Sequence, residues 1–212
     1  MMNENIIKRN ELLAKKMIPV LESRNYEAHY AASKEEALKI ALELIPEGSS
    51  ISWGGSMSIK EIGLAQAVHE GNYDVYDREM AATPEEKRAI ALKAFDCDYY
   101  LASTNAMSED GILVNIDGAA NRVAAISFGP RNVIMIVGMN KVVRTEEDAY
   151  QRAKYIAAPI NAQRFGKAPC TQTGACVNCK SSACICCQTL TTRFSLVPKR
   201  IKIILVNDEL GF

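Results

Sequence analysis

The sequence predicts an α/β protein in which helices flank both faces of a mostly parallel sheet. Strand-like apolar runs alternate with segments of helical periodicity in the first half of the chain, and further strands follow as a cluster. The runs 133–138 and 201–206 are apolar apart from Lys202, as expected of strands buried on both faces. With 212 residues, the chain is long enough to bury a substantial core in one domain.

Capping patterns and periodicity locate the predicted helices. Ser33 followed by Glu36 is a capping-box pattern, and Thr83 followed by Pro84 is a typical pair of N-cap and first-turn residues. Thr145 is the predicted N-cap of the last long helix. We therefore expect helices over residues 1–25, 34–44, 57–70, 84–95 and 146–164.

Strands are predicted where apolar or alternating runs lie between turn-forming residues. The turn-forming pieces, at 105–111, 117–121 and 129–132, are rich in glycine, asparagine and aspartate. The predicted strands cover residues 26–32, 49–53, 73–77, 98–103, 111–116, 122–128, 132–138 and 201–208.

The composition argues against nucleic-acid and membrane partners. Lysine and arginine together number 25, as do aspartate and glutamate, so no net charge attracts a polyanion or an anionic membrane. The longest apolar runs are far too short to span a bilayer. Residues 1–16 contain no apolar signal segment. We therefore expect a cytoplasmic protein whose thiols stay reduced.

A cysteine cluster is the least random feature of the sequence. Six of the seven cysteines lie between Cys170 and Cys187, with the spacing C-x5-C-x2-C-x4-C-x-C-C. Cys176 and Cys179 form a CxxC pair, and thiolates select zinc or iron–sulfur clusters over hard cations. We predict that residues 168–190 are a cysteine-rich insertion that a bound metal holds in place.

Disulfides, free thiols and a redox-active pair are the alternatives to a metal site. Disulfides fit poorly with a reducing compartment and with an odd number of cysteines. Some of the cysteines could be free structural thiols, because four ligands would leave two of the six unused. A redox-active CxxC pair would need a thioredoxin-like setting, which the surrounding sequence lacks. We interpret Cys97, which stands apart from the cluster, as a small core residue.

A glycine- and serine-containing loop is the second informative feature. Gly54, Gly55 and Ser56 follow a predicted strand, and Ser58 lies at the start of the next predicted helix. Glycine allows a ligand to approach the backbone closely, and hydroxyls and amides at such a turn can bind an anion. The alternative is an ordinary turn with Ser56 or Ser58 as the N-cap.

Polar residues also interrupt the apolar strands between residues 103 and 143. Polar groups crowded at strand ends beside glycine turns suggest a lined pocket, although turns use the same residue types. Arg122 is the least expected of these residues, because it stands at the start of a predicted apolar strand. The residues concerned are Asn105, Glu109, Asp110, Asn115, Asp117, Asn121 and Arg122.

Several motifs together closely resemble the lactate-utilisation (LUD) family. They are W-GGS-x-S-x-x-EIGL at 53–64, S-x-NA-x-SEDG-x-LVN-x-DG-x-x-NRVA at 103–124, FGP at 128–130 and VG-x-NKVV at 137–143. PC-x-x-TG-x-C-x-x-C-x-S at 169–181 and the terminal VN-x-ELGF complete the pattern. The resemblance covers the chain from about residue 30 onward, and it indicates the branch with a cysteine-bearing C-terminal segment.

The resemblance implies a single LUD-like domain over 1–212, with a fold like that of ribose-5-phosphate isomerase, glucosamine-phosphate deaminase and coenzyme A transferases. It also implies a role in oxidising lactate to pyruvate beside an iron–sulfur oxidoreductase partner. By position in the family pattern, Cys170, Cys176, Cys179 and Cys186 are the expected ligands of an iron–sulfur cluster or zinc. Cys184 and Cys187 stand where arginine and asparagine are usual, so either could substitute or add a ligand.

If the fold relatives guide the chemistry, the loop of Gly54, Gly55 and Ser56 would hold a phosphate, a carboxylate or a cofactor tail. Arg122 or Lys141 would pair with the anion. The ligand-binding residues would then be Gly54, Gly55, Ser56, Ser58, Asn105, Asn121, Arg122 and Lys141.

Glu109 or Asp110 would be the general base of such a site. We expect ordinary surface or core roles for His29 and His69.

Three classes of function are compatible with these features. The leading one is a component of lactate or hydroxy-acid utilisation that assists a redox complex. The second is a stand-alone isomerase or transferase that acts on a phosphorylated or coenzyme A-linked anion. The third is a non-catalytic regulator that binds a small anion. The sequence leaves open whether the chain is catalytic alone and whether it forms a homo-oligomer.

Overall fold

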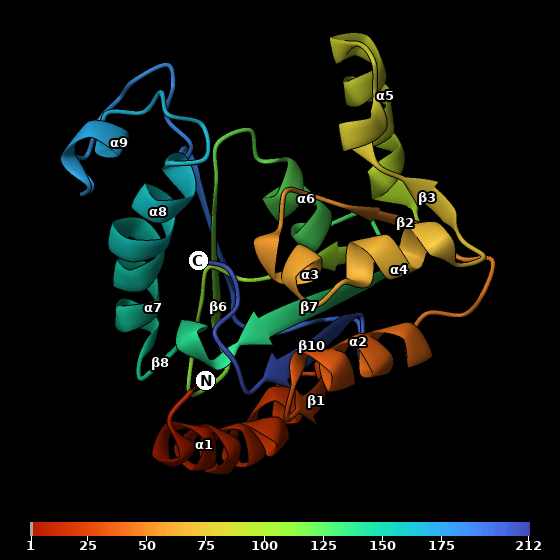
Figure 1. Ribbon diagram of the computed structural model, residues 1–212, viewed down its shortest axis with the longest axis vertical. Helices are drawn as coiled ribbons and strands as arrows, with labels where there is room; N and C mark the ends of the chain where they lie inside the picture. The colour runs from red at the N-terminus through yellow and green to blue at the C-terminus, as the bar shows by residue number, and fades with distance from the viewer. Residues whose placement is uncertain (1) are drawn as a thin grey trace.

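The computed structural model describes residues 2–212 and contains a six-stranded parallel sheet flanked by helices, together with a smaller four-stranded sheet (Figure 1). The predicted α/β class is therefore confirmed. Among the described residues, no helix is both long enough and apolar enough to cross a membrane.

The large sheet has the strand order β1-β10-β7-β4-β2-β3, and all of its pairings are parallel. Its two central apolar strands pair in register from Ile201 opposite Val133 to Val206 opposite Gly138. Both are almost entirely buried, as their predominantly apolar sequences predict. The strands are β1 (Glu27–Ala31), β2 (Ser50–Trp53), β3 (Asp74–Tyr76), β4 (Tyr99–Ala102), β7 (Asn132–Gly138) and β10 (Ile201–Val206).

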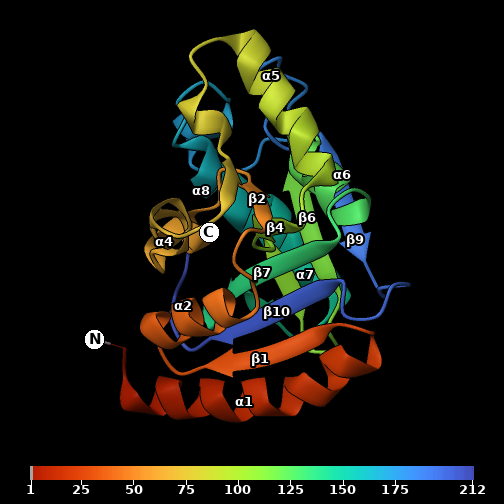
Figure 2. The same ribbon diagram turned by 90° about the vertical axis from the view of Figure 1, so that its right-hand side faces the viewer.

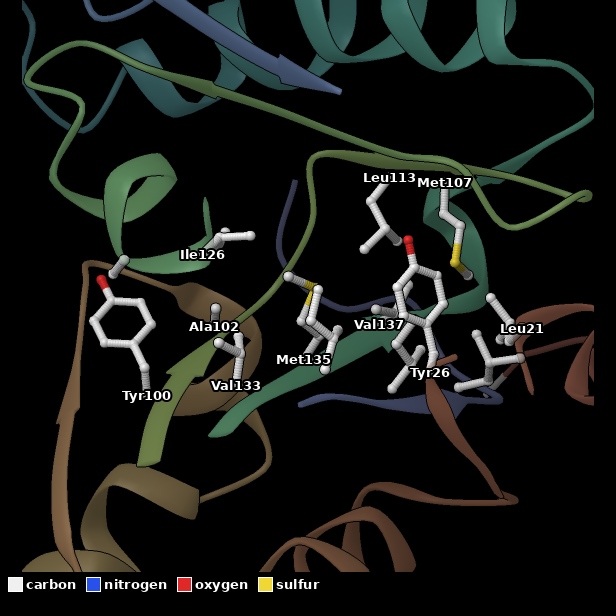
Figure 3. Close-up of a cluster of buried hydrophobic side chains, with 14 of the residues drawn as sticks. Leu21, Tyr26, Tyr100, Ala102, Met107, Leu113, Ile126, Val133, Met135 and Val137 are labelled. Carbon is white, nitrogen blue, oxygen red and sulfur yellow. The ribbon is translucent and has the colours of Figure 1, made fainter. Parts of the chain in front are cut away.

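Each face of the large sheet has its own apolar core. Val133, Met135 and Val137 of β7 pack into the core that includes residues of helix α1, whereas Ile134 and Ile136 belong to the opposite core. Figure 3 shows part of the first core, where Leu21 and Tyr26 lie near Met107 and Leu113 of the smaller sheet. Because successive side chains of a strand point to opposite faces, one central strand anchors both cores.

Helices α1, α2, α3, α4 and α5 occupy the first half of the chain, and Figure 2 shows α1 lying along β1. The predicted caps are present: Ser33 Oγ accepts a hydrogen bond from Glu36 N at 3.3 Å, and Thr83 forms a capping box with Glu86. Gly63 has a φ of +77° and divides the helix predicted over 57–70 into two. The helices are α1 (Glu4–Ser23), α2 (Lys34–Glu43), α3 (Met57–Glu61), α4 (Leu64–Glu70) and α5 (Pro84–Lys93).

The predicted strand over 122–128 is wrong, because this segment forms helix α6 (Asn121–Ser127). Its buried Val123 and Ile126 are three residues apart, which places them on one helical face. The Val123 amide donates to Asp117 Oδ2 at 2.9 Å and fixes the first turn. A short apolar run fits a buried helix as well as a buried strand, and here the tertiary contacts decide.

The smaller sheet has the order β8-β5-β6-β9 and contains three strands that the sequence did not predict. β5 lies inside the predicted turn at 105–111, β8 pairs parallel with β5, and β9 follows the cysteine segment and pairs antiparallel with β6. All three are short or largely polar, so they lack the apolar signal of a buried strand. The strands are β5 (Ala106–Ser108), β6 (Leu113–Asp117), β8 (Val142–Val143) and β9 (Gln188–Thr192).

The helix predicted over 146–164 is present but irregular. Thr145 forms a capping box with Asp148, as expected of its N-terminus. A π-helical turn over Ala153–Ala157 separates α7 (Glu146–Arg152) from α8 (Ala158–Ala162), and Pro159 lies in the first turn of α8. The chain then enters the cysteine segment, whose only helical turn among the described residues is α9 (Cys170–Thr173).

Truncating a buried side chain in a central strand should destabilise the protein. Leu205→Ala removes a fully buried side chain from β10 and should lower the free energy of unfolding by about 2–5 kcal/mol. The matched control is Leu196→Ala, because Leu196 is 87% exposed and its loss should have almost no effect. Urea denaturation of the two variants measures the difference, and equal destabilisation would contradict the assigned core.

Candidate functional site

A cavity of about 350 Å³ lies where several parallel strands end. Its walls include segments that follow the carboxyl ends of β2, β3, β4, β7 and β10, which is where open α/β sheets usually bind ligands. Residues 54–58, 78–79, 87, 103–105, 116–119, 121–122, 141, 161, 164–165, 185 and 211–212 line it.

The glycine loop forms one wall of the cavity, as the sequence predicts. A Cβ atom on Gly54 would lie 3.2 Å from Tyr100 Oη, so the backbone comes close to the neighbouring strand β4. Ser56 is the N-cap residue of α3, but its side chain makes no capping bond. Its buried Oγ has no hydrogen-bond partner within residues 2–212, which leaves a polar group available to a ligand.

Two guanidinium groups converge on Gly55. A Cβ atom there would lie 3.6 Å from Arg164 Nη2 and 3.9 Å from Arg78 Nη2. Arg164 Nη1 also donates to the Gly55 carbonyl at 2.9 Å. Lys87 adds a third positive charge to the cavity lining. The sequence pattern does not single out these three cations, because each lies in a polar segment where surface charges are ordinary.

The cavity carries an excess of positive charge. Within residues 2–212, none of Arg78, Lys87 and Arg164 forms an ion pair with a carboxylate. The two acidic side chains in the lining are already paired, because Glu79 binds Lys60 at 2.8 Å and Asp117 binds Arg122. An anionic ligand would therefore meet positive charges that the protein itself leaves uncompensated.

Lys141 is buried at the cavity and hydrogen-bonded to two hydroxyls. It lies in the turn after β7, is 3% exposed, and its Nζ donates to Ser58 Oγ and to Ser103 Oγ, each at 2.9 Å. Burial, together with the charges of Arg152 and Arg122, lowers the pKa of Lys141 to about 7, whereas Glu61 opposes the shift. The structure thus brings the predicted Ser58 and Lys141 together and adds Ser103, which the sequence did not single out.

The Arg122 guanidinium donates hydrogen bonds to several segments around the cavity. Its Nε donates to Asp117 Oδ1 at 2.9 Å. One terminal nitrogen donates to Asn115 Oδ1 and the Ser103 carbonyl, and the other to Asn105 Oδ1 and the Ile116 carbonyl, at 2.6–3.0 Å. These five bonds match the five N–H donors of a guanidinium. Arg122 therefore has no spare donor, and the expected pairing of Arg122 with a ligand anion does not fit this geometry.

The two predicted asparagines line the cavity in different ways. Asn105 is engaged by the protein, since its Oδ1 accepts from the Arg122 guanidinium and from the Ile116 amide. Asn121 begins α6 beside the cavity. Of these two side chains, Asn121 is the better candidate for contact with a ligand.

Glu109 and Asp110 do not lie at the cavity. They occupy the turn between β5 and β6, where Asp110 Oδ2 accepts from Arg24 at 3.0 Å and the Glu109 amide donates to Val143. This turn is at the opposite end of the hairpin from Asn105 and Asp117, so the structure gives neither carboxylate access to a ligand in the cavity. The histidines lie outside the cavity lining, beside Glu27 and Asp77 respectively.

Five cysteines line a second, small cavity beside α8. They are Cys170, Cys176, Cys179, Cys184 and Cys186, whereas Cys187 lies outside the lining. Cys184 Sγ and Cys186 Sγ are 3.3 Å apart, and all seven cysteines are free thiols. Over residues 2–212, no three histidine, cysteine or acidic side chains are arranged as a ready metal site. Cys97 is fully buried, as predicted for a core residue.

The local surroundings shift the pKa values of Cys184 and Cys186 in opposite directions. The backbone amide of Cys186 donates to Cys184 Sγ and lowers the pKa of Cys184. Burial raises the pKa of Cys186 to about 12. Cys184 is therefore the cysteine whose thiolate the protein itself favours, although the position-based ligand set uses Cys186.

One residue separates the two cavities. Ile185 contributes to the lining of both, and a Cβ atom on Gly118 would come within 3.0 Å of Ile185 Cα. The cysteine segment is thus part of the wall of the larger cavity, and it continues directly into β9 of the smaller sheet.

The sequence model of the LUD domain family matches residues 14–206. The chain belongs to the LUD domain family. This family is generally linked to lactate utilisation, and the match confirms the resemblance seen in the motifs. The comparison with curated proteins finds no match.

One solved structure supports the fold of this LUD domain. A DUF162 family protein from Deinococcus radiodurans is similar over 93% of this chain and 98% of its own, with a TM-score of 0.54 and 14% identity. At that identity, the likeness shows the fold alone. The delta subunit of eIF2B from Chaetomium thermophilum aligns with 68% of this chain and 57% of its own, with a TM-score of 0.35 and 17% identity.

The Arg122 network predicts a large loss of stability when the guanidinium is removed. Arg122→Met would leave Asp117 and two asparagine side chains without their partner, so we expect the free energy of unfolding to fall by about 3–5 kcal/mol. Arg131→Met, at an exposed arginine, is the matched control and should change little. Chemical denaturation checks both, and a small effect at Arg122 would contradict its structural role.

Proposed function

We propose that this LUD domain binds a small carboxylate-bearing metabolite and assists the oxidation of lactate to pyruvate. The observation that carries the proposal is the pair of guanidinium groups at Gly55. Two like charges beside one backbone position repel each other unless an anion lies between them. Arginine suits this task because its planar fork matches the two oxygens of a carboxylate.

The rest of the cavity fits the other end of such a metabolite. Ser58 and Lys141 offer hydrogen-bonding groups that suit the hydroxyl or carbonyl next to the carboxylate. A volume of about 350 Å³ is at the small end of ligand pockets, which favours a small organic acid. The uncharged wall at Ile116 and Ile185 leaves room for a short apolar substituent.

Oxidation of lactate removes two electrons as well as two protons. Lys141 can take a proton, because its pKa near 7 leaves the amine partly neutral at neutral pH. Amino-acid side chains of the cavity are poor acceptors of an electron pair. We therefore assign the electrons to an iron–sulfur oxidoreductase partner, in keeping with the general link of the family to lactate utilisation.

We also propose that the cysteine segment binds an iron–sulfur cluster or zinc. Five thiols around one cavity form a soft donor set that fits either group. Cys170, Cys176, Cys179 and Cys186 would hold it, with Cys184 as the alternative ligand on the same cavity. A cluster would supply one-electron transfer, and zinc would supply a structural clamp. Either group would hold Ile185, which lines both cavities, in a fixed position.

A second candidate function remains, because the same cations suit a phosphate. Under this alternative the protein is an isomerase or transferase that acts on a phosphorylated or coenzyme A-linked substrate, or a regulator that binds one. The measured affinities for a carboxylate and for a phosphorylated ligand distinguish the two candidates.

Ligand binding provides the direct test of the main proposal. Lactate, pyruvate and a phosphorylated hydroxy acid would each be titrated into the purified protein by calorimetry. We expect lactate or pyruvate to bind, and Arg78→Gln to weaken binding about tenfold, or about 1.4 kcal/mol, through loss of a charge-assisted bond. Arg88→Gln, an exposed arginine of α5 outside the cavity, is the control. Preference for the phosphorylated ligand would favour the second candidate.

Metal analysis tests the cysteine proposal. Protein purified without oxygen or added metal should contain iron with sulfide, or zinc, and the double variant Cys176→Ser with Cys179→Ser should lose it. Cys187→Ser should keep the metal, because this thiol lies outside the small cavity. Cys97→Ala is a second control in the core. Full metal content in the double variant would contradict the ligand set.

A further inference from the structure

We propose that Ser58 is a nucleophile and Lys141 its general base, and that they form an acyl-transfer site for an ester or thioester with an anionic end. The observation is the contact between the two side chains inside the cavity. Ser58 Oγ and Lys141 Nζ are 2.9 Å apart, and both residues are almost fully buried. This activity is independent of lactate oxidation and needs neither a metal nor an electron acceptor.

The second serine orients the lysine. Ser103 Oγ donates to the Ile136 carbonyl at 2.6 Å, so its oxygen accepts from Lys141 Nζ. Ser103 is thus a positioning residue that fixes the amine and directs its lone pair, when neutral, toward the Ser58 hydroxyl. A nucleophile beside a base that a third group orients is the arrangement found in acyl-transfer enzymes, which include serine–lysine types.

The charges around Lys141 keep its amine available as a base. Arg122 of α6 and Arg152 of α7 face it with positive charge, and Glu61 of α3 faces it with negative charge. Burial and the two arginines outweigh Glu61, so the pKa falls to about 7. A base with this pKa is neutral in a large fraction of molecules at neutral pH and can still return its proton.

Gly211 packs directly against the nucleophile. The position that a Cβ atom on Gly211 would occupy is 2.8 Å from Ser58 Oγ and 3.3 Å from Lys141 Nζ. Any larger residue at this position would press on both side chains, so glycine preserves the contact between Ser58 and Lys141. Ser58, Lys141 and Gly211 all line the same cavity as Arg78 and Arg164, which would hold the anionic end of the substrate.

The reaction proceeds in two balanced steps. Ser58 Oγ bonds to the acyl carbon while its proton passes to Lys141 Nζ, and the bond to the alcohol or thiol leaving group then breaks as that group takes the proton. In the second step, water or another acceptor attacks the acyl-Ser58 ester and gives a proton to Lys141. The bond between the acyl carbon and Ser58 Oγ then breaks, and Ser58 takes the proton back from Lys141. The alternative is that Lys141 only ties α3 to the ends of β4 and β7.

The test uses two chromogenic esters and the unmodified protein. A neutral ester, 4-nitrophenyl acetate, and an anionic one, the 4-nitrophenyl monoester of succinate, would be mixed with the protein. The acylated protein would be digested, and mass spectrometry of the peptides would locate the acyl group. We expect the acyl group on Ser58, faster acylation by the anionic ester, and a rate that rises with pH and levels off above about 7, where Lys141 is neutral.

Variants separate catalysis from structure. Ser58→Ala and Lys141→Arg should each slow acylation by about a hundredfold or more. Ser103→Ala should move the pH inflection lower, because the ammonium loses an acceptor. Ser23→Ala, at the exposed end of α1, should behave as the unmodified protein.

The location of the acyl group decides the proposal even if a variant fails to fold. No acylation, or acylation of another residue including Lys141, would overturn the proposal. A pH profile without an inflection near 7, or full activity in folded Lys141→Arg, would overturn the role of the lysine. Each of these results leaves the binding of lactate or pyruvate as a separate measurement, so the failure of one proposal does not imply the failure of the other.

Discussion

The Arg122 guanidinium is the contact on which the geometry of the cavity depends. It joins the loop after β4, through Ser103 and Asn105, to the end of β6, through Asn115 and Asp117. The large and small sheets therefore meet at a fixed distance on one side of the cavity. The same half-buried charge faces Lys141 and, after burial and Arg152, contributes to its lowered pKa, so Arg122 affects both the shape and the proton chemistry of the site.

Around that anchor, different walls of the cavity offer different chemistry. Arg78 and Arg164 provide positive charge at the glycine loop, whereas Lys141 with its two serines provides a base and hydroxyls. The thiols lie behind Ile185, next to the cavity but outside it. Unpaired positive charges, a buried amine with two hydroxyls and a group of thiols are thus adjacent but line different walls.

The sequence predicted the large sheet better than the small one, for a physical reason. The strands at 132–138 and 201–206 are buried on both faces, so their sequences are nearly continuously apolar and easily recognised. The strand at 188–192 is polar and is defined by its pairing with β6, which no local pattern reveals. The segment at 122–128 was predicted as a strand and forms a helix, because its short apolar run suits both.

By itself, the sequence determined the α/β class, the family, the glycine loop and the clustered cysteines, because these are local patterns of residue type and spacing. Only the tertiary structure decided what the side chains do. Ser58, Ser103 and Lys141 are far apart in the chain and meet because β4 and β7 are neighbours that end beside α3. The same strand order explains why Arg122 bonds to protein groups and not to a ligand. It also places Glu109 in a turn away from the cavity. Contacts between loops depend on which strands pair, and that pairing depends on the burial of the whole core.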